Sequence, residues 1–323
     1  MTEPALITPA SEVPVEEARQ TRESYEALLG RLSRQSVTKR YECYRDIDWD
    51  APEFRIEPDD PRWELPASDP LGGTAWYRAL PAATRTRLGL YRLATFMKVG
   101  LQFENVLSQG LLRFALTRGE QSPEQRYAYH ELIEESHHSM MFAEFVRRTG
   151  LEIRGLARVW LRIDRVVVAL GERFPELFFV FVLGGEDPID HAQRLALAER
   201  DGLHPLVKRM SQIHITEEAR HLCFARSFLR EHVPKLSPKK RAVLAVAAPA
   251  VLRLTAELML RPSPSLVREF DIPPAVVDEA FTHNAAYRAL TFQSLAKVRA
   301  LMDELGLITP RTARWWKTIG AAA

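Results

Sequence analysis

The chain has 323 residues, of which 46% are hydrophobic and 27% charged, a composition that allows a sizeable buried core. Its 44 lysines and arginines nearly balance 42 aspartates and glutamates, and the formal net charge of +2 argues against nucleic acid or an anionic membrane as a partner. Two cysteines, Cys43 and Cys223, are too few for a disulfide framework, and no secretory pattern begins the chain, so we expect a cytoplasmic protein that acts on a small molecule.

The N-terminal part of the sequence shows no helical periodicity at first. Residues 1–14, MTEPALITPASEVP, carry three prolines, so we expect a disordered tail there. A short helix is expected from Val15. Residues 41–74 are rich in proline, aspartate and tryptophan without a repeating pattern, which predicts an ordered loop that wraps the rest of the chain. We expect residues 15–323 to form a single domain.

The remainder of the chain favours helix and shows no convincing alternating strand pattern. One helix start is indicated by Ser122-Pro123, and its end by Gly150. Because the connections are short, sequential helices should pack antiparallel in a bundle whose core spans about 80–305. The expected helices cover about 80–118, 122–149, 157–200 with an interruption, 203–233, 237–260, and a set from 264 to 305.

The most apolar stretch of the sequence is VLAVAAPAVLRLTAELML, which begins at Val243. It contains Pro249, Arg253 and Glu257. We therefore expect a core helix that is kinked at the proline, and no membrane-spanning segment.

A short pattern occurs twice. EESHHSMMFAEF, from Glu134, and EEARHLCFARSF, from Glu217, both read Glu-Glu-x-x-His followed by an apolar stretch. Residues three apart point from nearly the same side of a helix, and paired Glu-x-x-His motifs on separate helices are how a helical bundle holds two metal ions. One copy alone would be weak evidence, because solvated helices often carry such charges.

The first copy allows two registers. At about 100° per residue, Glu135 and His138 share a side with aromatic residues, whereas Glu134 and His137 lie toward arginines and are expected to be partly exposed. In the second copy, EEARH, only the second glutamate stands three residues before the histidine. That glutamate aligns with Glu135, so we select Glu135 and His138 as the donors of the first copy.

The second copy carries an additional donor. HITEEARH places His214, Glu218 and His221 within about 60° on one otherwise apolar face of a helix. Burying a free carboxylate there would cost several kcal/mol, and a metal ion removes that penalty. A core histidine bonded to a carbonyl is the alternative for His214, and its spacing to the other two donors favours a ligand.

A two-metal bundle also needs single carboxylates from its two remaining helices. Glu104 is the only acid between Thr84 and Thr117, and it lies on an apolar stripe. Glu186, in FVLGGEDPID, follows an apolar run beside two glycines and a proline, a setting in which helices are often interrupted at functional positions. The acids that compete with Glu186 are Glu172, Glu176, Asp187 and Asp190.

The donor set indicates the metal. Four carboxylates and three imidazoles without a thiolate suit iron or manganese and disfavour a structural zinc site. The donor set alone leaves iron and manganese both open. The expected donors, in chain order, are Glu104, Glu135, His138, Glu186, His214, Glu218 and His221.

With these donors in this order, the sequence resembles the p-aminobenzoate N-oxygenase family of non-haem di-iron proteins over roughly residues 80–300. The third histidine, one turn before the second Glu-x-x-His, is what separates this family from other paired-motif proteins, and His214 fills that place. The resemblance implies a ferritin-like, all-α bundle with additional helices and an N-terminal extension. It also implies two iron ions, ahead of manganese or a mixed manganese–iron pair. Glu104, Glu135 and His138 would serve one iron, and the other four donors would complete the pair.

The resemblance further implies that O2 is a co-substrate and that the protein oxygenates a small substrate, by N-oxygenation of an arylamine. A hydroxylase or desaturase of an acyl or carrier-bound substrate is the alternative within the same chemistry, and product analysis would separate the two. A non-catalytic iron-binding protein and a helical interaction module belong to other classes. Catalytic turnover of O2 with substrate would separate the first from an oxygenase, and absence of bound metal after purification from iron-supplemented cells would favour the second.

The substrate pocket and the partners are less well indicated. Met141, Phe142, Phe145 and Phe228 could line or back a pocket, although such stripes also form ordinary core. Arg288 is a candidate contact for an acidic substrate, against a plain surface role. Because no nucleotide-binding glycine fingerprint is present, electrons should come from a ferredoxin or a flavin reductase. The sequence does not define the subunit number, and a homodimer is compatible with it.

Overall fold

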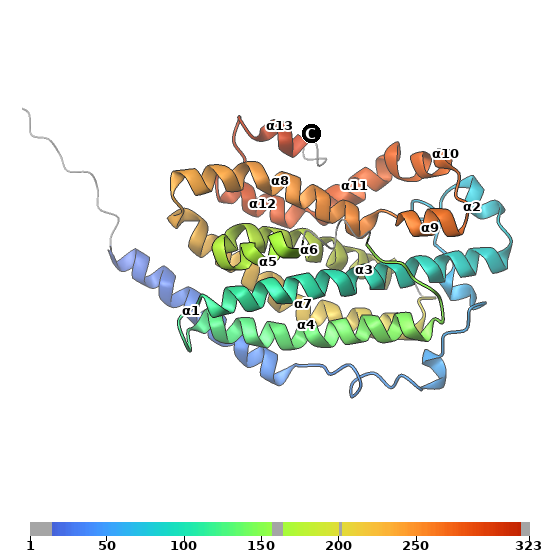
Figure 1. Ribbon diagram of the computed structural model, residues 1–323, viewed down its shortest axis with the longest axis horizontal. Coiled ribbons are helices and arrows are strands. Elements are labelled where there is room, and N and C mark those ends of the chain that lie inside the picture. The colour runs from blue at the N-terminus through green and yellow to red at the C-terminus, as the bar shows by residue number, and fades with distance from the viewer. Residues whose placement is uncertain (1–14, 157–163, 200–201, 318–323) are drawn as a thin grey trace, which may run out of the picture.

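The computed structural model describes residues 15–156, 164–199 and 202–317, and within them the chain forms helices and no strand. Figure 1 shows the long helices lying side by side, with smaller helices above them. The expected tail over 1–14 lies outside the described residues. The α-helices are α1 Val15–Thr38, α2 Ala75–Ala79, α3 Ala82–Leu116, α4 Pro123–Arg148, α5 Asp164–Arg173, α6 Pro175–Glu199, α7 Pro205–His232, α8 Pro238–Leu260, α9 Pro264–Glu269, α10 Pro274–Val277, α11 Ala285–Ser294, α12 Ala296–Glu304 and α13 Ala313–Lys317.

Several helices begin with the same local signal, a serine followed by a proline. At the starts of α4, α8 and α9, the hydroxyls of Ser122, Ser237 and Ser263 each accept a backbone N–H of the first turn. The proline that follows each serine has no N–H to leave unsatisfied, and its fixed φ suits the first helical residue. The Ser122-Pro123 start was expected from the sequence, and α4 begins there.

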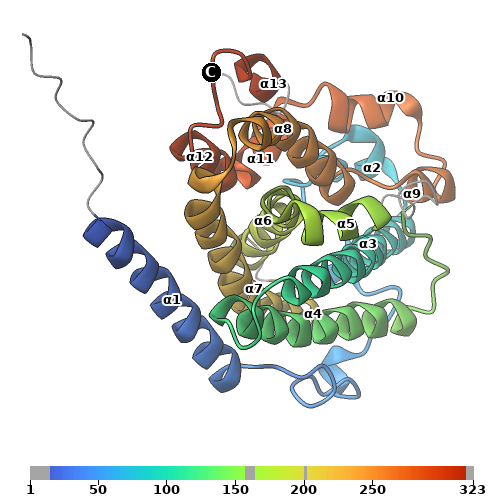
Figure 2. The same ribbon diagram turned by 60° about the vertical axis from the view of Figure 1, so that its left-hand side comes forward.

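Four long helices, α3, α4, α6 and α7, form the bundle core. Helix α3 packs along α4, and α6 packs along α7, while α4 also contacts α7 and α3 also contacts α6. Figure 2, which looks more nearly along the bundle, shows these four helices around a common centre. The arrangement is an all-α, ferritin-like helical bundle, as expected from the sequence.

The other helices cover the core from outside. Helix α8 packs on α6, α5 packs on α3, and α1 lies against α4 and α7 at the opposite side of the bundle (Figure 2). The segment Pro238–Glu269 is long and apolar enough to cross a membrane by length and composition alone. Within it, however, Leu244, Ala248 and Leu252 are fully buried in the core of the protein. This agrees with the expectation of a core helix.

One expectation about the elements was wrong. Helix α1 extends over 24 residues, whereas a short helix was expected. The interruption expected within 157–200 is present among the described residues at Phe174, between α5 and α6. The chain is not interrupted beside Glu186, because α6 continues through the Gly-Gly and Pro188 region as one helix from Pro175 to Glu199.

Residues 41–74 form an ordered loop with two short 3-10 helices, Pro52–Phe54 and Pro61–Trp63. Trp49 and Trp63 are buried, and the Trp63 ring stacks on His204 at 4.3 Å between ring centroids. The indole N–H of Trp49 donates to the carbonyl of Cys43. The loop therefore packs against the bundle and contributes to its core, as the sequence indicated.

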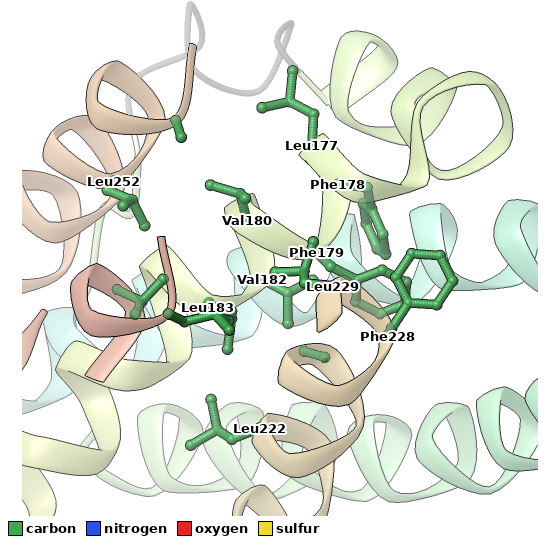
Figure 3. Close-up of a cluster of buried hydrophobic side chains, with 14 of the residues drawn as sticks. Leu177, Phe178, Phe179, Val180, Val182, Leu183, Leu222, Phe228, Leu229 and Leu252 are labelled. Carbon is green, nitrogen blue, oxygen red and sulfur yellow. The ribbon is translucent and has the colours of Figure 1, made fainter. Parts of the chain in front are cut away.

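Two apolar clusters fill the bundle. The phenylalanine cluster is built around Phe114, Phe179, Phe224 and Phe228, and Figure 3 shows part of it with leucines of α6, α7 and α8. The tryptophan cluster contains Trp49, Trp63, Met97, Met141, Phe142, Phe145 and Met210. A third, smaller group joins Leu71, Tyr77, Leu88 and Tyr91 to α9 and α10.

Two glycines of α6 allow its close packing just before Glu186. A Cβ on Gly184 would lie 2.4 Å from Thr255 Oγ1 of α8, and a Cβ on Gly185 would lie 2.1 Å from the Phe103 ring of α3. Such contacts are far inside van der Waals range, so larger residues would push α6 away from both neighbours. The unusual Gly-Gly pair is therefore explained by close helix packing.

The substitution Gly185→Ala tests this packing. Because the added methyl meets a buried ring, we expect it to lower the free energy of unfolding by about 1–3 kcal/mol. Chemical denaturation monitored by circular dichroism measures the change. Gly119→Ala is the matched control, since a Cβ there meets no atom within 4 Å, and it should leave stability nearly unchanged. Equal stability of the two variants would contradict the packing explanation.

Candidate metal centre

A layer of ionisable side chains lies between the phenylalanine cluster and the tryptophan cluster. In α7, Met210 and Ile213 of the tryptophan cluster precede His214, and Leu222 and Ala225 of the phenylalanine cluster follow His221. The order is reversed in α4, because that helix runs antiparallel to α7. The predicted donors thus occupy the middle of the bundle. All seven predicted donors are fully buried: Glu104, Glu135, His138, Glu186, His214, Glu218 and His221.

The two Glu-x-x-His pairs face each other across α4 and α7. His221 Nδ1 lies 2.9 Å from Glu218 Oε1 and 3.0 Å from Glu135 Oε1. His138 Nδ1 lies 3.4 Å from Glu135 Oε2 and 3.5 Å from Glu218 Oε1. Each glutamate is therefore close to both imidazoles, the position expected of a carboxylate that bridges two cations.

The other three predicted donors join the same layer from α3, α6 and α7. His214 Nε2 lies 3.5 Å from Glu104 Oε1, and the His214 ring lies 4.6 Å from the His138 ring. Both carboxylate oxygens of Glu186 are buried without a hydrogen-bond partner. A ligand atom of Glu186 nevertheless lies within 4.8 Å of ligand atoms of His214 and Glu218. The structure thus brings together all seven side chains selected from the sequence.

Two further glutamates hold the outer nitrogens of the imidazoles. Glu134 Oε2 lies 2.7 Å from His221 Nε2, and Glu217 Oε2 lies 3.0 Å from His138 Nε2. Each glutamate thus contacts the histidine of the other helix. When Nε2–H donates to these carboxylates, the lone pair of each Nδ1 faces the centre of the layer, as metal-ligating histidines require.

The sequence reasoning had assigned Glu134 to a partly exposed face, and this was wrong. Glu134 is fully buried, whereas His137 is only half-buried, with its Nδ1 accepting the backbone N–H of Cys43. The helix angle of Glu134 was read correctly, but its side chain faces His221 and Arg220 of α7, and not solvent. The doubled glutamate of both motifs was the signal, because each first glutamate reaches across to the opposite helix.

Arg220 ties this outer shell to the N-terminal part of the chain. Its Nη2 lies 2.7 Å from Glu134 Oε1 and 3.6 Å from Glu217 Oε1. The same guanidinium donates to Ser36 Oγ of α1, and the backbone N–H of Tyr41 donates to Glu217 Oε1 at 3.0 Å. Helix α1 and the start of the loop therefore close the layer on the side of α4 and α7.

The pKa values reflect both burial and crowding of like charges. Burial, and next the charge of Glu135, raises the pKa of Glu104 well above its usual range, and burial with the charge of Glu218 does the same for Glu186. Burial opposes protonation of His138, but its hydrogen bonds to Glu135 and Glu217 outweigh this and raise its pKa to about 10. Burial lowers the pKa of His214 well below its usual value. A cation bound in this layer would therefore displace protons from these groups.

Charge balance explains why this layer suits cations. It contains one buried guanidinium, that of Arg220, and seven buried carboxyl groups. The seven belong to Glu104, Glu131, Glu134, Glu135, Glu186, Glu217 and Glu218. Unpaired buried charges are strongly disfavoured, whereas divalent cations neutralise carboxylates at short range. Atoms of three donors lie within 4.8 Å of one another in four overlapping groups: Glu104, His138 and His214; Glu131, Glu135 and His221; Glu135, His138 and Glu218; and Glu186, His214 and Glu218. The residues present thus fit a pair of metal ions.

A cavity of about 1270 Å³ approaches the layer from the side of the tryptophan cluster. Its inner wall includes Met97 of α3, Val207 and Ser211 of α7, and Gln193 of α6. Ser211 stands one turn before His214 on nearly the same face, so the cavity comes within about one helical turn of the donor layer. Its outer part is bordered by residues 62–74 and by α9 and α11.

The predicted pocket residues do not all lie near this cavity. Met141, Phe142 and Phe145 belong to the tryptophan cluster, which backs the cavity, and the Phe142 ring lies 5.4 Å from the His214 ring. Phe228 belongs to the phenylalanine cluster on the other side of the layer and stacks on His232. Arg288 is exposed on α11, donates to the carbonyl of Thr282, and is absent from the cavity wall. None of the five predicted residues is therefore in the cavity wall, and Phe228 and Arg288 lie away from it altogether.

Charged side chains around the cavity come from other positions. Arg92 pairs with Asp69 at 2.9 Å, and Arg261 donates to Thr282 Oγ1. The charged residues of the cavity wall are Arg62, Asp69, Arg92, Glu257, Arg261, Arg268 and Glu279. Basic and acidic groups are thus both present, and the sequence offered no signal for them because they come from separate elements.

The chain is similar to one described protein family and to proteins of two mycobacterial species. The family model described as "P-aminobenzoate N-oxygenase AurF" matches residues 22–306 of the chain. The chain is 39% identical over 293 residues to the uncharacterized protein MT0908 of Mycobacterium tuberculosis (strain CDC 1551 / Oshkosh), an alignment that covers 91% of this chain and 86% of that protein. It is 38% identical, with the same coverage, to the uncharacterized proteins Mb0909 of Mycobacterium bovis and Rv0885 of Mycobacterium tuberculosis (strain ATCC 25618 / H37Rv).

Substitution of the outer glutamates tests the crossed hydrogen bonds. Glu134→Gln and Glu217→Gln each weaken the acceptor that orients one imidazole, so we expect each to weaken metal binding by about 10–100-fold. Titration of the metal-free protein with Mn(II), with free ion counted by electron paramagnetic resonance, measures this. Glu144→Gln is the matched control on α4, because Glu144 pairs with Arg147 and Arg148 away from the layer. If all three variants bound Mn(II) as the unmodified protein does, the orienting role would be refuted.

Proposed function

Because the chain belongs to the p-aminobenzoate N-oxygenase family, a family of di-iron oxygenases, we propose that it uses two iron ions and O2 to oxygenate the nitrogen of an arylamine. The observation that carries this proposal is the buried layer in which four carboxylates and three imidazoles converge. Carboxylate and imidazole donors without thiolate suit iron that reacts with O2.

The donor roles follow from the distances. Glu135 and Glu218 would serve both ions, since each lies near both His138 and His221. Glu104, Glu186 and His214 would be the remaining donors. Two ferrous ions held here would each supply one electron to O2. The chain's own residues keep these donors oriented and exclude bulk water.

The overall reaction is balanced as a mono-oxygenation. One oxygen atom of O2 enters an N–H bond of the amine to give a hydroxylamine, and the other leaves as water. This requires two electrons and two protons for each turnover. In the family, further oxidation leads toward nitro products. We propose a ferredoxin or a flavin reductase as the electron donor, because the sequence carries no nucleotide-binding glycine fingerprint.

The cavity is the proposed route and binding place for the amine. Its inner end offers Ser211 and Gln193 as hydrogen-bonding groups, and the Gln193 Oε1 atom is buried without a partner. The surrounding wall is largely apolar, formed by residues such as Leu93, Met97 and Val207. An aromatic ring could pack among these side chains while the amino group is directed toward the donor layer.

Hydroxylation or desaturation of an acyl or carrier-bound substrate is the second candidate, and the size of the cavity favours it. Small-molecule sites commonly measure about 300–1,000 Å³. The volume of about 1270 Å³ is larger than a single-ring amine needs. The substrate of this chain is therefore expected to be larger than one aromatic ring, whether nitrogen or carbon is oxidised.

Product analysis tests the reaction. With ferrous iron, a chemical reductant and 18O2, we expect arylamines to give hydroxylamines that carry one labelled oxygen, detected by mass spectrometry. His138→Ala should abolish turnover, because it removes a donor of the centre. Labelled alcohols or unlabelled alkenes from an acyl panel, with no oxidised amine, would instead establish the second candidate. Absence of any oxidised product with both panels would contradict an O2-dependent oxidation.

Partial filling of the cavity tests substrate access. Ala192 of α6 is half-buried and lines the cavity, so Ala192→Phe should lower kcat/KM by about tenfold or more for substrates larger than one ring, while leaving iron content unchanged. Ala198→Phe is the matched control, since Ala198 is exposed on the same helix and does not line the cavity. Equal kinetics for the two variants would place the substrate elsewhere.

A further inference from the structure

The two motif helices share a longer pattern than Glu-Glu-x-x-His. ELIEESHH in α4 aligns with HITEEARH in α7, so that Glu131 stands four residues before Glu135 as His214 stands four residues before Glu218. Residues four apart project from nearly the same side of a helix. The position that His214 occupies in α7 is therefore occupied in α4 by Glu131. This residue would add a fifth carboxylate to the four predicted carboxylate donors.

The surroundings of Glu131 match that position. Glu131 is 1% exposed, and its Oε2 atom has no hydrogen-bond partner. One of its oxygens lies within 4.8 Å of ligand atoms of both Glu135 and His221. The layer's guanidinium, on Arg220, is engaged with Glu134, so it does not serve as a counter-charge for Glu131. A buried carboxyl group with an unpartnered oxygen, close to two other donors, is in the environment of a metal ligand.

We propose that Glu131 is an eighth donor of the metal centre and binds the ion nearest to His221. This inference rests on the proposed function only in requiring that the centre hold metal ions. Helices α4 and α7 would then each contribute three donors at the same spacing. Glu131, Glu135 and His138 would come from α4, and His214, Glu218 and His221 from α7.

The consequence is a centre with two unlike ions. Near His138, the nearby donors include a second imidazole, His214, together with Glu104. Near His221, the corresponding additional donor is the carboxylate of Glu131. The ion near His138 would therefore have two imidazoles among its donors, and the ion near His221 would have one. The two ions should therefore bind with different affinities.

Metal titration of three variants at Glu131 tests the proposal. Metal-free protein is titrated with Mn(II), and free ion is counted by electron paramagnetic resonance. The unmodified protein should bind two ions. Glu131→Gln removes the charge, and Glu131→Leu removes the donor. Each should lower the affinity for one of the two ions by about tenfold or more and leave the affinity for the other unchanged. Glu131→His should restore two ions, because an imidazole serves at the equivalent position in α7.

A matched control and the thermal melting curve separate ligation from folding. Glu176→Gln is the control, since Glu176 is a similarly buried carboxylate in α6 with an unpartnered Oε2 and lies outside the donor groups. It should bind two ions as the unmodified protein does. The proposal is overturned if Glu131→Leu binds both ions with normal affinity. It is also overturned if the affinity for both ions falls together with a loss of helical structure. If the unmodified protein bound no ion, the proposed function itself would fail.

Discussion

The structure depends on the burial of seven carboxyl groups in a dry layer where Arg220 is the one buried guanidinium among the described residues. Such a layer is unstable unless cations or protons balance it. The apolar clusters above and below it exclude water, which strengthens every interaction within the layer. Close packing of α6 through Gly184 and Gly185 brings Glu186 into the layer, so the packing of the bundle and the chemistry of the centre are not separable.

The two sides of the layer differ in access. The phenylalanine cluster closes one side with tightly packed aromatic rings (Figure 3), whereas the tryptophan cluster on the other side is bordered by a cavity of about 1270 Å³. Substrate would therefore approach from the side of Met97 and Val207. On the outer side of α4 and α7, the layer is covered by α1 and by the start of the loop, through Ser36 and Tyr41. The loop over residues 41–74 therefore contacts both parts of the site. Its first residue, Tyr41, donates to Glu217 of the layer, and residues 62–74 border the cavity.

Sequence patterns predicted the helices and the inner donors well, because both depend on local periodicity. The repeated Glu-x-x-His and the apolar face around it required only that α4 and α7 meet. What the patterns missed depends on contacts between elements. Glu134 seemed exposed because nothing local places α7 over it. Phe228 and Arg288 were assigned to a pocket whose walls come from residues 62–74 and from several helices that are distant in sequence. The Gly-Gly and Pro188 setting suggested an interrupted helix beside Glu186, yet α6 continues through it.

The most direct measurement is an anomalous difference map, collected at the iron edge, from crystals of the full chain grown with ferrous salt. The account predicts two strong peaks a few ångströms apart, within the layer between the two apolar clusters and surrounded by the glutamates and histidines of α3, α4, α6 and α7. A map without paired peaks in that layer, or with iron bound only at the surface, would contradict the account.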